Sequence, residues 1–199
     1  MNLSEDKKVK SLFNYLFLFI IIGFGIYWRV HIYLSNIPLW WDEISLALSF
    51  FDRDIFGMFA YLECDQKAPP LFCVLVWIIK HFFANEQTSY ALRLLPLLAS
   101  IGSLFAFYFL LKDFYKSKFA ILMSMWIFAS SSVLIYYARE FKPYGFDVLI
   151  FIIILLLYKK ISFKNLTVIK SLGYSVLFAF FILLSFPSMF IIPSLRVCL

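Results

Sequence analysis

The stretch Trp40-Trp41-Asp42-Glu43 follows the first apolar run of the chain and opens a polar segment that reaches about Tyr90. Tryptophan is enriched where a membrane meets water, so two tryptophans beside two carboxylates indicate a site at a membrane surface. An acid pair pressed against the edge of a bilayer is desolvated, which is costly unless the pair has a function. We therefore expect residues 35–90 to carry a functional site and the remaining segments to form the frame that positions it.

The composition of the chain is that of a polytopic membrane protein. Of its 199 residues, 63% are apolar and 22% aromatic, with 26 Phe, and the mean hydropathy is +0.88. A soluble domain of this length needs a polar outer surface and does not use so many apolar residues. The formal charge of +6 is typical of basic cytoplasmic loops. Basic residues are not interleaved with exposed aromatics as in a nucleic-acid surface, so we expect no nucleic-acid partner.

The apolar runs predict an all-α integral membrane fold with about five transmembrane helices. A span needs about 20 residues, whereas 10–14 are typical of an interfacial or re-entrant piece. Leu71–Phe83 is of this shorter kind and is predicted to stay outside the membrane. The predicted spans are Leu12–Tyr27, Leu92–Leu111, Phe119–Tyr137, Tyr144–Leu157 and Leu172–Ile192, the last interrupted by Pro187.

The distribution of lysines and acids predicts the orientation of these spans. With Leu71–Phe83 outside, the basic segments Lys7–Lys10, Lys112–Lys118 and Lys159–Lys170 all face the cytoplasm, with three, three and four of the 18 Lys and Arg residues. If that segment crossed, the last two would lie outside, against the positive-inside rule. The prediction is a multi-pass plasma or inner membrane protein with a cytoplasmic N-terminus.

The first outer loop, residues 35–90, is acidic, as expected on the non-cytoplasmic side. Within it, Ile44–Leu62 has the spacing of one or two short juxtamembrane amphipathic helices. The loop's bases are Arg53, Lys67 and Lys80, against seven acids: Asp42, Glu43, Asp52, Asp54, Glu63, Asp65 and Glu86.

Neither end of the chain has the features of a processed or tailed protein. Trp28-Arg29-Val30-His31 follows the first apolar run where a cleaved signal peptide would have small residues, so a retained span is expected. The chain stops at Arg196-Val197-Cys198-Leu199, soon after a predicted span, which indicates a truncated N-terminal module. Cys64, Cys73 and Cys198 have no metal-site spacing. Cys64 and Cys73 are either free thiols or an outer-side pair.

The pair Asp42 and Glu43 is the first candidate for chemistry. A carboxylate here can act as a general base, or the pair can hold a divalent ion that offsets phosphate charge. The alternative is a pair of acids that only starts a helix, because negative charge is favourable at a helix N-terminus. The adjacent tryptophans favour the functional interpretation. The sequence leaves a metal requirement open.

Lys67 and Arg93 are candidates for binding a lipid phosphate. Lys67-Ala68-Pro69-Pro70-Leu71 places a lysine at headgroup depth before a proline-started helix, where it can meet a phosphate as a point charge or only snorkel. Arg93 lies one turn into a span, where its planar fork suits phosphate. The alternative for Arg93 is an interfacial position.

Arg139-Glu140-Phe141-Lys142-Pro143-Tyr144 is the densest polar cluster between two spans on the outer side. This stretch is either a solvated loop between the two spans or the part of the chain that completes a site with Asp42. Asp147, one turn into the next span, is a further candidate, since acids within a membrane are usually functional. Arg29, His31 and His81 are expected to be interfacial.

The order of these clusters resembles the membrane-integral GT-C glycosyltransferases, in the glycosyltransferase-39-like branch that includes protein O-mannosyltransferases and the lipid A aminoarabinose transferase. The matching stretches cover most of Trp28–Tyr158. They are Trp41-Asp42-Glu43, Lys67-Ala68-Pro69-Pro70-Leu71, Ala91-Leu92-Arg93-Leu94-Leu95-Pro96 and Tyr137-Ala138-Arg139-Glu140-Phe141-Lys142-Pro143-Tyr144.

The resemblance implies transfer of a sugar from a polyprenyl-phosphate carrier to a glycan, lipid or protein acceptor outside the cytoplasm. By analogy, Asp42 is the base and Glu43 supports it. Lys67 and Arg93 hold the departing lipid phosphate, and Arg139, Glu140 and Tyr144 shape the outer site. Family members are longer, and here Ala68 separates Lys67 from the prolines. The alternatives are a non-catalytic lipid-binding or transporter-like membrane scaffold and an inactive truncated relative.

Overall fold

The computed structural model describes residues 3–50, 53–82, 88–161 and 167–197, and the regular structure within these ranges is entirely helical. This confirms the predicted all-α class. The α-helices are α1 (Leu3–Leu34), α2 (Trp41–Leu48), α3 (Pro70–Phe82), α4 (Thr88–Phe114), α5 (Lys118–Ser130), α6 (Ser132–Tyr136), α7 (Tyr144–Lys160), α8 (Val168–Leu184) and α9 (Ser188–Val197), and two 3-10 turns are η1 (Phe56–Phe59) and η2 (Glu63–Asp65).

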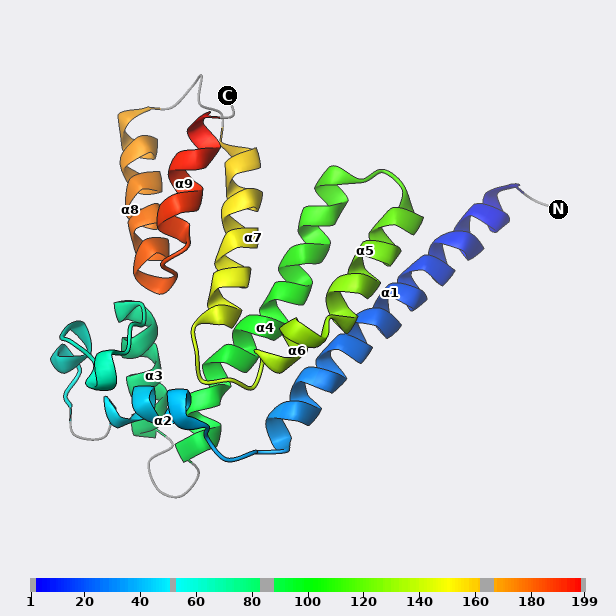
Figure 1. Ribbon diagram of the computed structural model, residues 1–199. Coiled ribbons are helices and arrows are strands. Elements are labelled where there is room, and N and C mark those ends of the chain that lie inside the picture. Colours follow the sequence, from blue (N-terminus) through cyan, green and yellow to red (C-terminus); the bar gives the residue numbers. More distant parts are fainter. Residues whose placement is uncertain (1–2, 51–52, 83–87, 162–166, 198–199) are drawn as a thin grey trace.

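The helices α1, α5, α4, α7, α9 and α8 lie side by side in one row, in that order (Figure 1). Helix α4 lies in the middle and packs against α1, α3, α5 and α7. The contact between α4 and α7 is close, because a Cβ on Gly145 would lie 3.0 Å from the carbonyl oxygen of Pro96. Proline and glycine thus face each other where these two helices meet.

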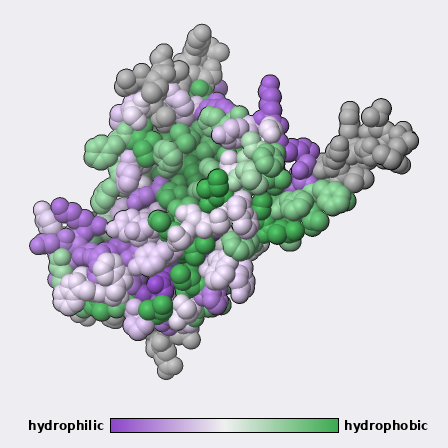
Figure 2. All heavy atoms as spheres, turned by 45° about the vertical axis from the view of Figure 1, so that its right-hand side comes forward, coloured by the Kyte–Doolittle hydropathy of each residue, from purple (hydrophilic) through white to green (hydrophobic). Residues whose placement is uncertain are grey.

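The helices of the row begin and end at two opposite edges, and these edges differ chemically (Figure 1). We call the end with α2, α3 and residues 137–143 the loop end. The opposite end has the start of α1, the α4–α5 turn and the end of α7, and we call it the lysine end because it carries Lys112, Lys116, Lys118, Lys159 and Lys160. Hydrophilic side chains gather over the loop end, whereas the middle of the row is hydrophobic (Figure 2).

Two helices are long and apolar enough to cross a membrane, by length and composition. They are Leu12–Leu34 within α1 and Ser89–Phe114 within α4, and α3, α5 and α8 are shorter apolar helices. In the apolar stretch of α1 only 17% of the residues are buried, whereas in the apolar stretch of α4 50% are buried. Helix α1 therefore presents most of its apolar surface outward, which agrees with a helix that borders lipid.

Two predicted spans are each divided into two helices, and only the second was predicted to be interrupted. Phe119–Tyr137 is broken at Ser131, whose hydroxyl accepts a hydrogen bond from the Leu134 amide and so starts α6. Leu172–Ile192 is interrupted near Pro187, as predicted: α8 ends at Leu184, Ser185 is extended, and α9 starts at Ser188 and packs back against α8. Pro187 lacks the amide hydrogen needed to continue α8, so the chain reverses there.

The first loop is less helical than its spacing indicates. Helix α2 ends at Leu48, and among the described residues between it and α3 only η1 and η2 are helical, so the prediction of amphipathic helices through Ile44–Leu62 is wrong there beyond α2. Asp54 accepts the Gly57 amide and caps η1 at 2.8 Å. Short polar side chains of this kind compete with helix by bonding to nearby backbone. Asp52, Glu86 and Lys164 lie outside the described residues.

Helix α3 begins at Pro70 and has the length predicted for Leu71–Phe83. Its Trp77 indole donates to the Arg53 carbonyl at 3.0 Å, and its Lys80 ammonium donates to the Phe50 carbonyl. Both contacts bind α3 to the first loop, and α3 lies entirely at the loop end (Figure 1). Helix α3 therefore does not run from the loop end to the lysine end.

Candidate functional site: a cluster of paired charges at the loop end

The start of α2 sets the directions of the two adjacent acids. Trp40 is the extended residue before the helix, and Asp42 and Glu43 occupy its first turn. The Glu43 carboxylate turns back to accept the Trp40 amide at 3.3 Å, and both acids favour the positive N-terminal end of the helix. Because successive residues of a helix point about 100° apart, Asp42 and Glu43 face different surroundings.

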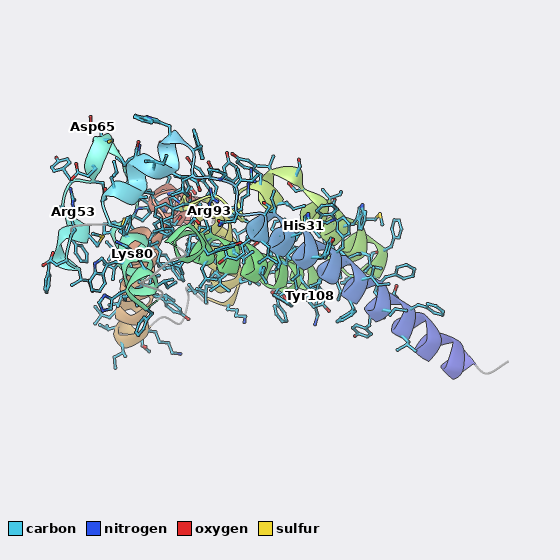
Figure 3. All side chains as sticks on the ribbon, turned by 90° about the horizontal axis from the view of Figure 1, so that it is seen from below. His31, Arg53, Asp65, Lys80, Arg93 and Tyr108 are labelled. Carbon is cyan, nitrogen blue, oxygen red and sulfur yellow. The ribbon has the colours of Figure 1, made fainter. Side chains whose placement is uncertain are left out.

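Glu43 forms a buried, two-pronged ion pair with Arg93 of α4. Arg93 Nε lies 3.0 Å from Glu43 Oε1 and Nη2 lies 2.5 Å from Oε2, and the two side chains are only 5% and 1% exposed. Arg93 Nη1 also donates to the Ile37 carbonyl at 2.6 Å. Arg93 lies inward, where the first loop meets α4, whereas Arg53 and Asp65 lie at the outer edge (Figure 3). The pair therefore binds three segments together.

Residues 138–143 reach the same cluster through Phe141. Its ring is fully buried against Phe50 and Phe72. Its amide donates to Glu43 Oε1 at 2.6 Å. With Trp40 and Arg93, this brings the hydrogen bonds that Glu43 accepts to four. Such complete pairing is what makes a buried carboxylate tolerable.

Asp42 belongs to a second network, with Lys142 and Gln66. Lys142 Nζ lies 2.7 Å from Asp42 Oδ2, and the Gln66 amide donates to Asp42 Oδ1 at 3.0 Å. Lys142 also donates to Gln66 Oε1 at 2.8 Å, which closes a triangle. The Asp42 side chain is 34% exposed and the Lys142 side chain 8%. The hydrogen bond from Lys142 lowers the pKa of Asp42, so this carboxylate is ionised and open to solvent at neutral pH.

Glu140 is the least satisfied acid of the cluster. Its Oε1 accepts the Trp40 indole at 2.9 Å, whereas its buried Oε2 has no hydrogen-bond partner among the described residues. Burial raises the pKa of Glu140 and the nearby Glu43 charge adds to the effect. Arg139 lies beside it, with its guanidinium 5.2 Å from the ring centre of Tyr136. A pocket of about 100 Å³ is lined by Trp40, Glu43, Arg93, Tyr136, Arg139 and Glu140, with Ile37 and Pro38.

Tyr144 lies next to this cluster but lines a different cavity. Its ring is 4.8 Å from that of Tyr137, and both tyrosines border a cavity of about 280 Å³ between α4, α6 and α7. Asp147 and Ser100 also line this cavity. Ser185, in the turn after α8, donates to Asp147 at 2.7 Å. Tyr144 therefore lies between the charged cluster and a second polar cavity.

Lys67 makes no hydrogen bond or ion pair in the described part of the chain, and its side chain is exposed. Its neighbours differ: Gln66 enters the Asp42 network, and Ala68 and Pro69 are buried before α3 begins at Pro70. The proline pair thus starts a helix, as predicted. Lys67 is thus an exposed residue directly after Gln66 of the cluster, without a contact to the cluster in the described part of the chain.

Arg29 is not interfacial, in contrast to the prediction. It is fully buried in α1, where it donates to Ser100 at 2.8 Å and to the Gly25 and Ala129 carbonyls. Helix α1 continues to Leu34, so Arg29 lies more than a turn inside the helix rather than at its exit. His31 is exposed and stacks on Tyr27, and His81 is exposed and stacks on Trp77, in agreement with interfacial positions.

Two members of the cluster were not singled out from the sequence as site residues. Lys142 was part of the predicted polar stretch 139–144, but its pairing with Asp42 depends on the tertiary fold, which buries Phe141 and Lys142 against the first loop. Gln66 could not be identified from the sequence, because a neutral amide side chain in a polar loop is most often only solvated. Cys64 and Cys73 are free thiols, exposed and buried respectively, and Cys198 lies outside the described residues.

Asp42 and Glu43 do not form a chelating pair. Both oxygens of Glu43 accept hydrogen bonds, and Asp42 faces Lys142 and Gln66 in another direction. Within the described ranges, no three His, Cys, Asp or Glu residues gather as a metal site would require. Asp42 and Glu43 as arranged thus do not fit a divalent ion held jointly between them.

Comparison of the chain with protein-family models, with curated proteins and with solved structures gave no match.

Proposed function

We propose that the chain is the N-terminal membrane module of a GT-C-like glycosyltransferase. The reaction is transfer of a sugar from a polyprenyl-phosphate donor to a glycan, lipid or protein acceptor outside the cytoplasm. The observation that carries the proposal is the assembly of Asp42, Glu43, Arg93, Glu140 and Lys142 at the loop end, opposite the lysine end. Three segments that are far apart in sequence contribute to this one polar surface.

The proposed topology has five crossings, by α1, α4, α5 with α6, α7 and α8, and α9 returns from the outer side. The lysine end faces the cytoplasm, in keeping with the positive-inside rule, and the loop end faces outward. Helix α3 remains at the loop end (Figure 1), so no crossing is added between α2 and α4. The alternation of the longer helices between the two ends supports this arrangement.

Asp42 is the group that we assign to the acceptor. Its carboxylate is one-third exposed and is held ionised in a fixed direction by Lys142 and Gln66. The acceptor hydroxyl oxygen forms a bond to the anomeric carbon of the sugar, and the bond from that carbon to the phosphate oxygen breaks. The polyprenyl phosphate leaves with the electron pair, and the hydroxyl proton passes to Asp42. Glu43 supports this step by fixing the start of α2.

Arg139 is better placed than Arg93 to hold the departing phosphate. Arg93 is buried and commits its guanidinium to Glu43 and the Ile37 carbonyl. Arg139 is partly exposed, pairs with no acid in the described ranges and borders the small pocket beside Glu140. Lys67 is exposed on the aqueous side and supplies a second positive charge. Preorganised cations stabilise the charge that develops on a leaving group.

The test is transfer of a labelled sugar from a polyprenyl-phosphate donor by membranes of cells that express the chain, against membranes without it. Asp42→Asn should lower the rate at least about 100-fold, the order expected when one group in direct contact with the reacting atoms is removed. The matched control is Glu63→Gln, which removes an exposed acid of the same loop and should leave the rate unchanged. An unchanged rate with Asp42→Asn would remove Asp42 from the mechanism.

A second candidate function is a non-catalytic membrane scaffold. The observation that favours it is the mutual pairing of the four charges Asp42, Lys142, Glu43 and Arg93, which a purely structural role also explains. The scaffold predicts no transfer by any expressed form of the chain, whereas the transferase predicts transfer that Asp42→Asn abolishes.

A further inference from the structure

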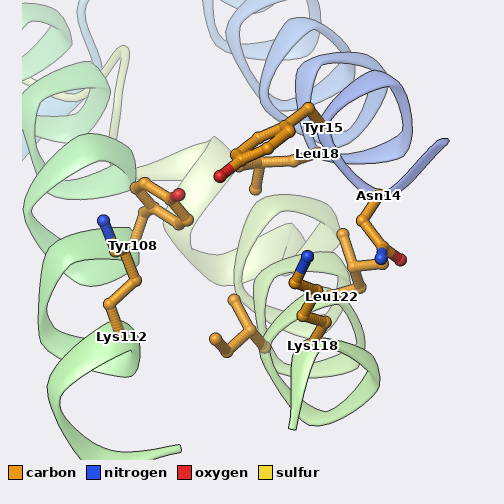
Figure 4. A pocket seen from close by; sticks show the side chains of 8 residues that line it. Asn14, Tyr15, Leu18, Tyr108, Lys112, Lys118 and Leu122 are labelled. Carbon is orange, nitrogen blue, oxygen red and sulfur yellow. The ribbon is translucent and has the colours of Figure 1, made fainter. Parts of the chain in front are cut away.

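A second pocket lies at the lysine end, on the opposite side of the row from the charged cluster. It has a volume of about 110 Å³ and lies among α1, α4 and α5 (Figure 4). Asn14, Tyr15 and Leu18 contribute from α1, Tyr108 and Lys112 from α4, and Lys118, Ile121 and Leu122 from α5. The pocket therefore lies near the lysine-end limits of Leu12–Leu34 and Ser89–Phe114, the two apolar segments that are long enough to cross a membrane.

The polar residues of the pocket are arranged as a positive rim. Lys112 Nζ lies 5.5 Å from the ring centre of Tyr108, and Lys118 Nζ lies 5.8 Å from that of Tyr15. These contacts hold the two ammonium groups on facing helices, and the tyrosine hydroxyls point into the space between them (Figure 4). Asp113 follows Lys112 in sequence but does not line the pocket. Among the described residues that line the pocket, two are cations, three are neutral hydrogen-bonding groups and none is an acid.

The floor of the pocket is apolar, and this favours a phospholipid over a free phosphate ion as the ligand. Leu18, Ile121 and Leu122 form this floor: they line the pocket, are partly buried and pack against the apolar core among α1, α4 and α5. A free phosphate ion gains nothing from contact with leucine and isoleucine, because it has no apolar surface to remove from water. A phospholipid does, since its glycerol and acyl carbons continue directly from the phosphate. Positive charge above an apolar floor therefore matches an amphiphile with an anionic head.

We propose that this pocket is a binding site for the headgroup of an anionic phospholipid in the leaflet at the lysine end. The phosphate lies between Lys112 and Lys118 and accepts hydrogen bonds from Tyr15 and Tyr108, and the first acyl carbons contact Leu18 and Leu122. Basic pockets between membrane helices are known to bind anionic lipid headgroups. The site is separate from the charged cluster, so it does not depend on sugar transfer.

The experiment is native mass spectrometry of the full chain in detergent, titrated with phosphatidylglycerol and, separately, with phosphatidylcholine of the same acyl chains. Each of Lys112→Gln and Lys118→Gln should weaken phosphatidylglycerol binding about 5-fold, and the double variant about 25-fold, since each surface lysine contributes a similar increment. Binding of phosphatidylcholine should be weaker and unchanged by these variants. Lys112→Arg with Lys118→Arg keeps both charges and should retain most of the affinity.

The matched control is Lys116→Gln, in the same α4–α5 turn. It removes the same charge from the same surface, but Lys116 does not line the pocket. It should change phosphatidylglycerol binding less than 2-fold. A loss with Lys116→Gln equal to that with Lys112→Gln would overturn the proposal, because only general surface charge would then be involved. Displacement of phosphatidylglycerol by 10-fold molar excess of inorganic phosphate would also overturn it, in favour of a small-anion site.

Discussion

The inner and outer sides of the start of α2 carry neighbouring carboxylates with opposite surroundings. On the inner side, Glu43 is 1% exposed and accepts four hydrogen bonds, two of them from Arg93. On the outer side, Asp42 is 34% exposed and shares Lys142 with Gln66. The difference shows that adjacent acids with the same sequence signal divide two tasks. Glu43 fixes the geometry of the loop end, and Asp42 remains accessible to a ligand.

The inner pair should therefore control stability. Glu43→Gln leaves Arg93 buried without its counter-charge, and loss of one partner of a buried ion pair costs about 3–5 kcal/mol. We expect the free energy of unfolding in detergent, measured by circular dichroism against denaturant, to fall by this amount.

Its control is Glu63→Gln, which breaks the ion pair between Arg53 and Glu63 on the surface of the same loop. These side chains are 23% and 54% exposed, so the loss should be less than about 1 kcal/mol. Equal losses for the two variants would contradict the distinction between a buried and an exposed pair.

The outer pair should contribute less to stability. Asp42→Asn removes the counter-charge of Lys142, but Asp42 is one-third exposed, so solvent screens the pair. Lys142 also keeps its hydrogen bond to Gln66. We expect a loss of about 1 kcal/mol or less in the same unfolding measurement, even though the same variant should strongly lower the proposed sugar transfer. A loss as large as that of Glu43→Gln would show that Asp42 is a structural residue.

The pH dependence of stability should separate Asp42 from Glu140, with the smallest effects of the set. The pKa of folded Asp42 is lowered, so its contribution is present above the unfolded value of about 3.9 and is lost as pH falls below it. The pKa of folded Glu140 is raised, so its ionisation disfavours the folded state as pH rises above about 4.3.

Unfolding free energies of the wild type, Asp42→Asn and Glu140→Gln should consequently diverge at pH 7 and converge near pH 3. At neutral pH, Asp42→Asn should be the less stable and Glu140→Gln the more stable, relative to the wild type. The same sign for both variants at pH 7 would contradict the assigned surroundings of these two acids.

The sequence predicted the positions of most helices, because apolar runs and prolines are local signals. Leu92–Leu111 and Tyr144–Leu157 lie within α4 and α7, and the short predicted segment that begins at Leu71 is helical through Phe82 as α3. Helix breaks that depend on one small polar residue were not predicted. Ser131 interrupts an apolar run without changing its hydropathy. The interruption at Pro187 was predicted, whereas the return of α9 against α7 and α8 depends on tertiary packing.

The sequence predicted which residues gather at the candidate site better than it predicted which of them pair with each other. The sequence brought Asp42, Glu43, Arg93 and residues 139–144 to one surface through the expected topology. It did not distinguish Asp42 from Glu43, since which acid of a helical first turn faces inward is decided by tertiary contacts such as Phe141 and Arg93. Arg29 illustrates the same limit, because its burial follows from helix α1 extending past the apolar run and meeting Ser100.

The most direct measurement is labelling of single cysteines in intact cells with a membrane-impermeant maleimide. Native Cys64 is an exposed thiol at the loop end, and Ser117 lies in the exposed α4–α5 turn at the lysine end. One form keeps Cys64 alone; the other carries Ser117→Cys with the native cysteines replaced. Cys64 should react from outside, and the Ser117→Cys form should react only after the cells are permeabilised. Reaction of both forms in intact cells would place the two ends in one compartment and contradict sugar transfer at an outer surface.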